Sequence, residues 1–138
     1  MVLCEAAREF LLSGPIAHVV TLDEDGSPHV TMAWVDVDGD DLLFGTLFDQ
    51  RKLRNLRRDP RVAVSFEGHV VRPPGLREYL VIHGEAAVTE GGAPELLSSL
   101  AERYLGPHVA FPPMPDPPAG FVTRVRPARV TGVGPWTD

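Results

Sequence analysis

The feature that most constrains the fold is a set of short β-rich runs joined by turns too tight to contain a helix. Residues 16–22 and 29–37 are rich in valine, and the segment between them, 23–28, places a glycine where a hairpin turn needs positive φ. A second turn, at 38–40, leads into the run 41–47. Parallel strands need a crossover of about a dozen residues or more, so these links predict antiparallel strands.

Other segments extend this pattern into a mainly β domain with a few helices. Similar runs predict further strands at 61–68, 77–88 and 120–133. Helical spacing of apolar residues predicts helices at 2–12, 50–58 and 91–105. The expected architecture is therefore a single domain, residues 1–138, with six antiparallel strands.

Both faces of the second strand are apolar. Val30, Met32 and Trp34 alternate with Ala33, Val35 and Val37. A sheet with one wet face alternates more cleanly between apolar and polar residues. We therefore expect a barrel whose inside forms the core and whose outside is covered by a helix or by a second subunit.

The predicted helix at 50–58 is unusually basic for an acidic chain. Six of the thirteen basic residues, including Lys52, the only lysine, lie between Arg51 and Arg61, whereas the whole chain has a net charge of −6. Arg51 and Lys52 fall in the first helical turn, where the helix dipole favours acidic residues. An anion held between these cations and the free backbone N–H groups relieves the conflict, and phosphate is a common ligand of helix N-termini.

Two neighbouring polar residues fit a phosphate site at this point. Thr46 offers a hydroxyl at the end of the preceding strand, and Asn55 can hold the adjacent loop backbone. A plainly solvated basic helix face is the main alternative. A nucleic-acid patch is a weaker one, because the rest of the chain is acidic and no aromatic platform accompanies the arginines.

The motif formed by these residues resembles that of a known family. The stretch DGSPHVTMAWVDVDGDDLLFGT is followed by Lys52 six positions after Thr46, then by Asn55-Leu56 and Pro60. This order resembles the flavin-reductase-like split barrels related to pyridoxamine 5′-phosphate oxidase. Within them it is most similar to the branch that uses the deazaflavin coenzyme F-420.

The resemblance implies a fold, an assembly and a set of cofactor contacts. It implies a six-stranded antiparallel split β-barrel of the FMN-binding type, assembled as a homodimer with cofactor sites along the subunit interface. The family's phosphate-binding lysine falls on Lys52 and its neighbouring basic position on Arg51, with further contacts from Thr46 and Asn55. Many relatives carry another basic residue where this chain has Gln50.

The choice of cofactor depends on what lies beyond the phosphate. Coenzyme F-420 continues into an acidic oligoglutamate tail, which calls for a basic track, whereas FMN ends at the phosphate. Arginines able to supply such a track are Arg54, Arg57, Arg58, Arg72 and Arg77. Trp34 either packs in the barrel or at the dimer interface, or borders the cofactor ring. We therefore expect coenzyme F-420, with FMN as the alternative.

The expected activity is that of an oxidoreductase passing a hydride to a small unsaturated or quinone-like substrate. The rivals are an FMN-dependent oxidoreductase and a carrier that binds a flavin or haem without turnover. Because the cofactor carries the chemistry, no catalytic side chain is assigned. The five histidines are scattered, and no ligand spacing predicts a metal site.

Two segments remain without an assigned role. The proline-rich loop 106–120 either covers the substrate pocket or serves as a connector, and Trp136 either crosses to the partner subunit or lies in a frayed end. One cysteine permits no intrachain disulfide, and the N-terminal residues do not resemble a signal peptide. We expect a cytoplasmic protein without membrane or nucleic-acid partners.

Overall fold

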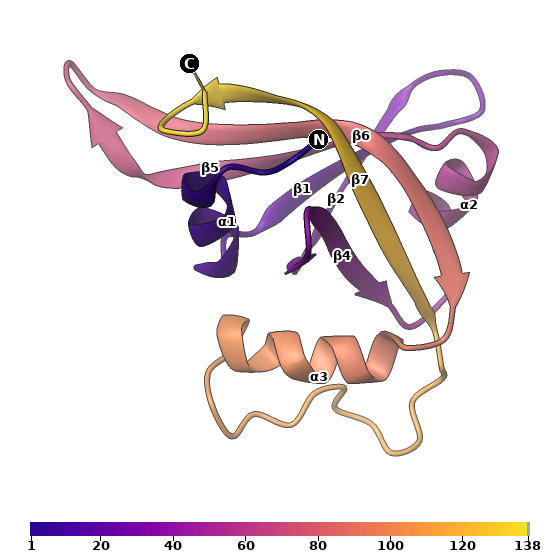
Figure 1. Cartoon of the computed structure of the whole chain (residues 1–138). Helices are drawn as coiled ribbons and strands as arrows, with labels where there is room; N and C mark the ends of the chain where they lie inside the picture. Colours follow the sequence, from indigo (N-terminus) through magenta and orange to yellow (C-terminus); the bar gives the residue numbers. More distant parts are fainter. Residues whose placement is uncertain (138) are drawn as a thin grey trace.

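The computed structural model describes residues 1–137, which form seven strands and three helices around one sheet (Figure 1). The elements are α1 (Glu5–Leu12), β1 (Ala17–Leu22), β2 (Pro28–Ala33), β3 (Asp36–Asp38), β4 (Asp41–Thr46), α2 (Arg51–Arg58), β5 (Arg61–Arg72), β6 (Leu76–Glu90), α3 (Ala93–Tyr104) and β7 (Phe121–Val133). All three predicted helices are present.

The sheet is antiparallel throughout, as the tight turns predict. Its strand order is β2-β1-β5-β6-β7-β4-β3. The strands at its two edges, β2 and β3, are consecutive in the chain and are separated only by Trp34 and Val35. The chain therefore passes directly from one edge of the sheet to the other, which curls the sheet toward a barrel.

The expected count of six strands is wrong by one, because the predicted strand 29–37 divides in two. Ala33 pairs with Ala17 of β1, whereas Asp36 pairs with Leu43 of β4. At the break, side chains of α3 replace the strand hydrogen bonds. The backbone N–H of Val35 donates to the Tyr104 hydroxyl at 3.2 Å, and the Val35 carbonyl accepts from Arg103 at 3.2 Å.

One apolar core fills the inside of the sheet. Its largest fully buried side chains include Phe44, Phe66, Leu80 and Ile82. Leu53 and Leu56 of the basic helix are buried as well, and α2 ends at Arg58, with Asp59 as its C-cap directly before Pro60. Figure 1 shows α3 lying across one end of the sheet, with the loop 106–120 beneath it.

The C-terminal segment folds back onto its own chain. The Trp136 indole N–H donates to the Tyr79 carbonyl at 2.9 Å, and its ring centroid lies 4.9 Å from that of Phe10. Within this one chain Trp136 is therefore neither frayed nor extended. None of the helices formed by residues 1–137 is long and apolar enough to cross a membrane.

The outer face of β2 is exposed in the single chain. Val30 and Met32 are 58% and 68% exposed, although both are large apolar side chains. The expectation of a helix covering this face is therefore wrong for both positions. Of the two expected covers, a second subunit is the one that the single chain leaves untested.

Candidate functional site

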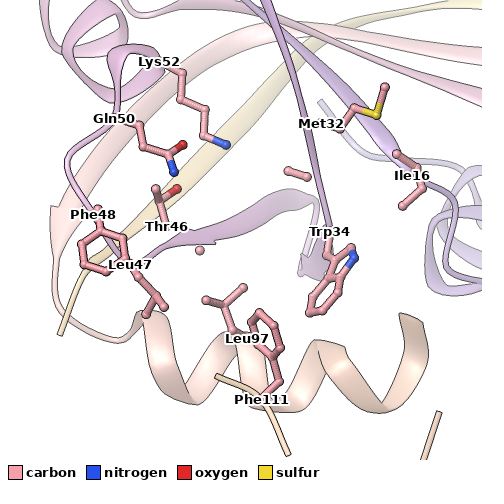
Figure 2. A pocket seen from close by; sticks show the side chains of 12 residues that line it. Ile16, Met32, Trp34, Thr46, Leu47, Phe48, Gln50, Lys52, Leu97 and Phe111 are labelled. Carbon is pink, nitrogen blue, oxygen red and sulfur yellow. The ribbon is translucent and has the colours of Figure 1, made fainter. Parts of the chain in front are cut away.

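A cavity of about 430 Å³ lies where the end of β4, the start of α2 and the middle of α3 meet. Its lining residues come from segments far apart in the chain, and Figure 2 shows their side chains. They are Ile16, Met32, Ala33, Trp34, Gly45, Thr46, Leu47, Phe48, Gln50, Lys52, Leu97 and Phe111. Polar groups gather at one end of the cavity, and apolar and aromatic groups form the other.

Lys52 dominates the polar end. It is the second residue of α2, and its side chain enters the cavity while only 5% of the residue is exposed. Among the described residues its ammonium has no hydrogen-bond or ion-pair partner, and Nζ lies 5.2 Å from the centroid of the Phe44 ring. Burial lowers the pKa of Lys52, because the charged form loses water without gaining a carboxylate.

Two uncharged polar side chains accompany the lysine. The Thr46 hydroxyl, at the end of β4, is buried and finds no hydrogen-bond partner among residues 1–137. Gln50 occupies the N-cap position of α2, but its side chain makes no capping hydrogen bond. Figure 2 shows Lys52, Gln50 and Thr46 gathered at the same end of the cavity. Among the described residues the buried hydroxyls without a partner belong to Thr31, Thr46 and Thr123, and of these only Thr46 lines the cavity, where a ligand could reach it.

The opposite end of the cavity is aromatic. Trp34 stacks on Tyr104 with 5.4 Å between ring centroids and an interplanar angle of 10°, and its ring lies 5.0 Å from that of Phe111. The Tyr104 hydroxyl donates to the Pro15 carbonyl at 2.7 Å, which fixes the ring beneath the tryptophan. Phe111 comes from the proline-rich loop, so this loop supplies part of the cavity wall.

Arg51 and Asn55 lie outside this cavity, although they neighbour Lys52 in sequence. Arg51 forms a two-bond ion pair with Asp23, and the buried Asn55 amide donates to Asp23 at 2.9 Å and to Thr21 at 3.1 Å. The Asn55 hydrogen bond, followed by Arg51, lowers the pKa of the Asp23 carboxyl. The two residues therefore fasten α2 to the end of β1 and to the β1–β2 turn, and Asn55 does so through side chains and not through the loop backbone that was expected.

The outer arginines are also engaged with groups of the same chain. Arg57 pairs with Asp49 at 2.9 Å, and its guanidinium lies 5.1 Å from the centroid of the Phe121 ring. Arg54 donates to the Asp49 carbonyl, and Arg58 donates to the side chain of Asn55. On the β5–β6 hairpin, the two arginines proposed for the tail are paired with acids: Arg72 with Glu78 and Arg77 with Glu67.

Of the residues expected to bind cofactor, the structure brings together Thr46, Lys52 and Trp34 at the cavity, whereas Arg51, Asn55 and the arginines expected to bind the tail lie outside its lining. Sequence reasoning missed Leu97 and Phe111, which complete the apolar end. The amphipathic pattern of α3 marks Leu97 only as an inward residue, and Phe111 lies in an irregular loop without periodicity. Neither Leu97 nor Phe111 therefore lies in a sequence pattern that indicates a place in the cavity wall.

His83 and the possible metal ligands lie apart from the cavity lining in the described chain. His83 contacts the Thr131 hydroxyl at 3.1 Å, and burial lowers the pKa of its ring. It lies outside the residues that line the cavity. Within residues 1–137 no three His, Cys, Asp or Glu side chains are arranged to hold a metal ion.

Comparison with protein families identifies the fold. Residues 3–134 match the family model described as pyridoxamine 5′-phosphate oxidase, which is nearly the whole chain. The chain belongs to the pyridoxamine 5′-phosphate oxidase family. The antiparallel split-barrel fold expected from the resemblance is thereby confirmed, and it is a flavin-binding type of fold. A comparison with curated proteins found no match.

Solved structures support this membership. An F420 reductase is 26% identical, with a TM-score of 0.70, over 90% of this chain and 94% of its own. The conserved hypothetical protein Rv2991 from Mycobacterium tuberculosis is 29% identical, with a TM-score of 0.74, over 96% of this chain and 85% of its own. HupZ from group A Streptococcus, at 17% identity and a TM-score of 0.66 over 98% of both chains, shares the fold.

Proposed function

We propose that this protein is an oxidoreductase that holds coenzyme F-420 in the cavity between β4, α2 and α3. The observation that carries the proposal is that Lys52 and Thr46, both buried and both without partners among residues 1–137, line one cavity. A phosphate oxygen accepts from an ammonium and from a hydroxyl, so these two groups fit a cofactor phosphate. The similarity to an F420 reductase over most of both chains favours the deazaflavin over FMN.

The apolar end of the cavity suits the ring of the cofactor. Trp34, Leu97 and Phe111 present a largely apolar surface there, which excludes water from a bound planar ring. Tyr104 supports this surface, because its ring stacks on Trp34 and its hydroxyl donates a hydrogen bond to the Pro15 carbonyl. We assign Trp34 to the border of the ring site.

The protein's role in the reaction is to bind, orient and exclude water. When bound, a reduced deazaflavin supplies a hydride to an electrophilic double bond or quinone. Of the described lining residues only Lys52 ionises, and it is assigned to the phosphate. The described lining residues therefore supply no general acid for the proton that completes the two-electron reduction.

The proposal includes a homodimer in which a second copy covers the mouth of the cavity. Four exposed apolar side chains lie on or beside that mouth: Val30 at 58%, Met32 at 68%, Phe48 at 57% and Ile16 at 42%. Apolar groups clustered on a surface mark an interaction site. Covering them also removes water from the ring end of the cavity.

Fluorescence titration of the purified protein with coenzyme F-420 and with FMN tests the proposal. We expect micromolar or tighter binding of coenzyme F-420, and turnover of the reduced cofactor with a panel of enones, quinones and nitroaromatics. Preferential binding of FMN assigns the protein to the FMN-dependent alternative. Tight binding without turnover on any substrate assigns it to the carrier alternative.

A further inference from the structure

The cavity holds a single charge. Among the described residues that line it, Lys52 is the only ionisable one, and the others are apolar or carry a neutral hydroxyl or amide. The buried ammonium therefore faces no carboxylate and is joined by no second cation. From the side chains of one chain that line the cavity, a ligand that enters meets a net charge of one positive unit.

The cation next to Lys52 in sequence, Arg51, is held outside the cavity by its own ion pair. Arg51 Nε lies 3.0 Å from Asp23 Oδ1, and Arg51 Nη2 lies 2.7 Å from Asp23 Oδ2. Asp23 is held in turn by the Asn55 amide, so the pair belongs to a fixed network on the other side of α2. The start of α2 adds backbone N–H groups to the site, but these carry no net charge.

We propose that this cavity selects phosphate esters with one negative charge, the phosphodiesters, over phosphomonoester dianions. The inference rests on the proposed function and specifies the ligand of the same site. A phosphodiester monoanion and one buried ammonium neutralise each other. A phosphomonoester at neutral pH is largely a dianion, and it leaves one negative charge uncompensated in a poorly hydrated site.

Gln50 is the position that sets this selectivity. It lies at the same end of the cavity as Lys52, it is exposed, and its side chain makes no capping bond that a substitution would remove. A cation placed there brings the site to two positive charges, which match a dianion. The neutral amide of the present chain leaves the phosphodiester as the better match.

The experiment compares two ligands that differ in phosphate charge alone. The 5′-phosphate of the deazaflavin riboside, a monoester, and its methyl phosphodiester are titrated at about pH 8 and about pH 5, and the pair is repeated on the flavin ring with FMN. The second pKa of a phosphomonoester is about 6, so at the lower pH both ligands carry one charge. We expect the diester to bind about tenfold tighter or more at pH 8, and the difference to shrink at pH 5.

Substitution at Gln50 tests the same idea from the protein side. Gln50→Lys should raise monoester affinity about tenfold at pH 8 and abolish the preference for the diester. Gln50→Met controls for shape, and Ser99→Lys, at an exposed position on α3, controls for overall charge. Circular dichroism checks that each variant folds.

Equal affinity for both esters at both pH values, with binding still dependent on Lys52, overturns the charge selection and leaves the cofactor site intact. Tighter binding of the monoester at pH 8 overturns it as well. Binding of either ester that is indifferent to Lys52→Met, or no binding of any ligand, overturns the proposed function together with the inference.

Discussion

Arg51 is bound to Asp23 by two hydrogen bonds of 3.0 and 2.7 Å, while the next residue, Lys52, enters the cavity without a partner among residues 1–137. Successive helical residues point about 100° apart, so two adjacent cations reach different sides of α2. The first cation completes the fold, and the second is left for a ligand. The predictions below test this division of roles.

Lys52→Met should have opposite effects on stability and on binding. Removing the buried, uncompensated charge should raise the free energy of unfolding of the ligand-free protein, because the desolvation of the ammonium is no longer opposed to folding. The same change should weaken coenzyme F-420 binding about tenfold or more, because a charged hydrogen bond contributes roughly 1.5 to 3 kcal/mol. Denaturant unfolding and fluorescence titration measure the two effects, and Arg61→Gln, outside the cavity, serves as control. A variant that is both less stable and unchanged in binding contradicts the assignment.

The pH dependence follows from the lowered pKa of Lys52. Affinity for the phosphate should fall as pH rises through the pKa of Lys52 in the free protein, which lies below the ordinary 10.5. Between the pKa of Lys52 in the folded protein and the ordinary 10.5, the unfolded chain binds more protons than the folded one. The free energy of unfolding of the ligand-free protein should therefore rise with pH in this range. Because Lys52 is the only lysine, isotopically labelled lysine gives one side-chain ammonium resonance for the titration. An unshifted titration refutes the prediction.

Thr46→Val should weaken cofactor binding without destabilising the fold. The Thr46 hydroxyl is buried and has no partner in the described chain, so replacing it by a methyl group removes no hydrogen bond from the free protein. The lost contact to phosphate should lower affinity about three- to tenfold, the equivalent of about 1 kcal/mol. Thr123→Val is the matched control, because Thr123 is equally buried and unpartnered but lies on β7 outside the cavity lining. Similar affinity losses in both variants would point to a general packing effect.

Asn55→Ala should destabilise the protein by about 1 to 3 kcal/mol, since buried partners are left without their hydrogen bonds. Asn55 is 3% exposed and donates to Thr21 and Asp23. Its amide also lowers the pKa of Asp23, which contributes stability above the ordinary pKa of 3.8 that is lost as pH falls through the folded-state value. As pH falls, the free energy of unfolding of the variant should therefore decrease less than that of the parent protein. If the free energy of unfolding decreases equally at acid pH in the variant and in the parent protein, the Asn55–Asp23 hydrogen bond is contradicted.

Met32→Glu should prevent self-association. Met32 is 68% exposed beside the cavity, and a charge there opposes burial against a second copy. Sedimentation should show a dimer for the parent protein and a monomer for the variant. Ser99→Glu adds the same charge at an exposed site on α3 and should stay dimeric. A parent protein that sediments as a monomer refutes the homodimer.

The sequence by itself determined the antiparallel pairing of the strands, the three helices and the family. Tight turns at 23–28 and 38–40 imposed antiparallel pairing, Pro60 ended the basic helix, and the spacing from Thr46 to Lys52 carried the resemblance. These are local effects, fixed by backbone geometry within a few residues.

Only the tertiary structure decided which groups meet at the cavity. Tyr104 and Arg103 split the strand at Val35 from about 70 residues away, Phe111 reached Trp34 from an irregular loop, and Asp23 drew Arg51 from the site. The apolar periodicity of the sequence does not indicate such contacts, because each contact depends on which distant segments folding brings together. A run of six cations in sequence thus became one buried charge at a cavity and five arginines elsewhere.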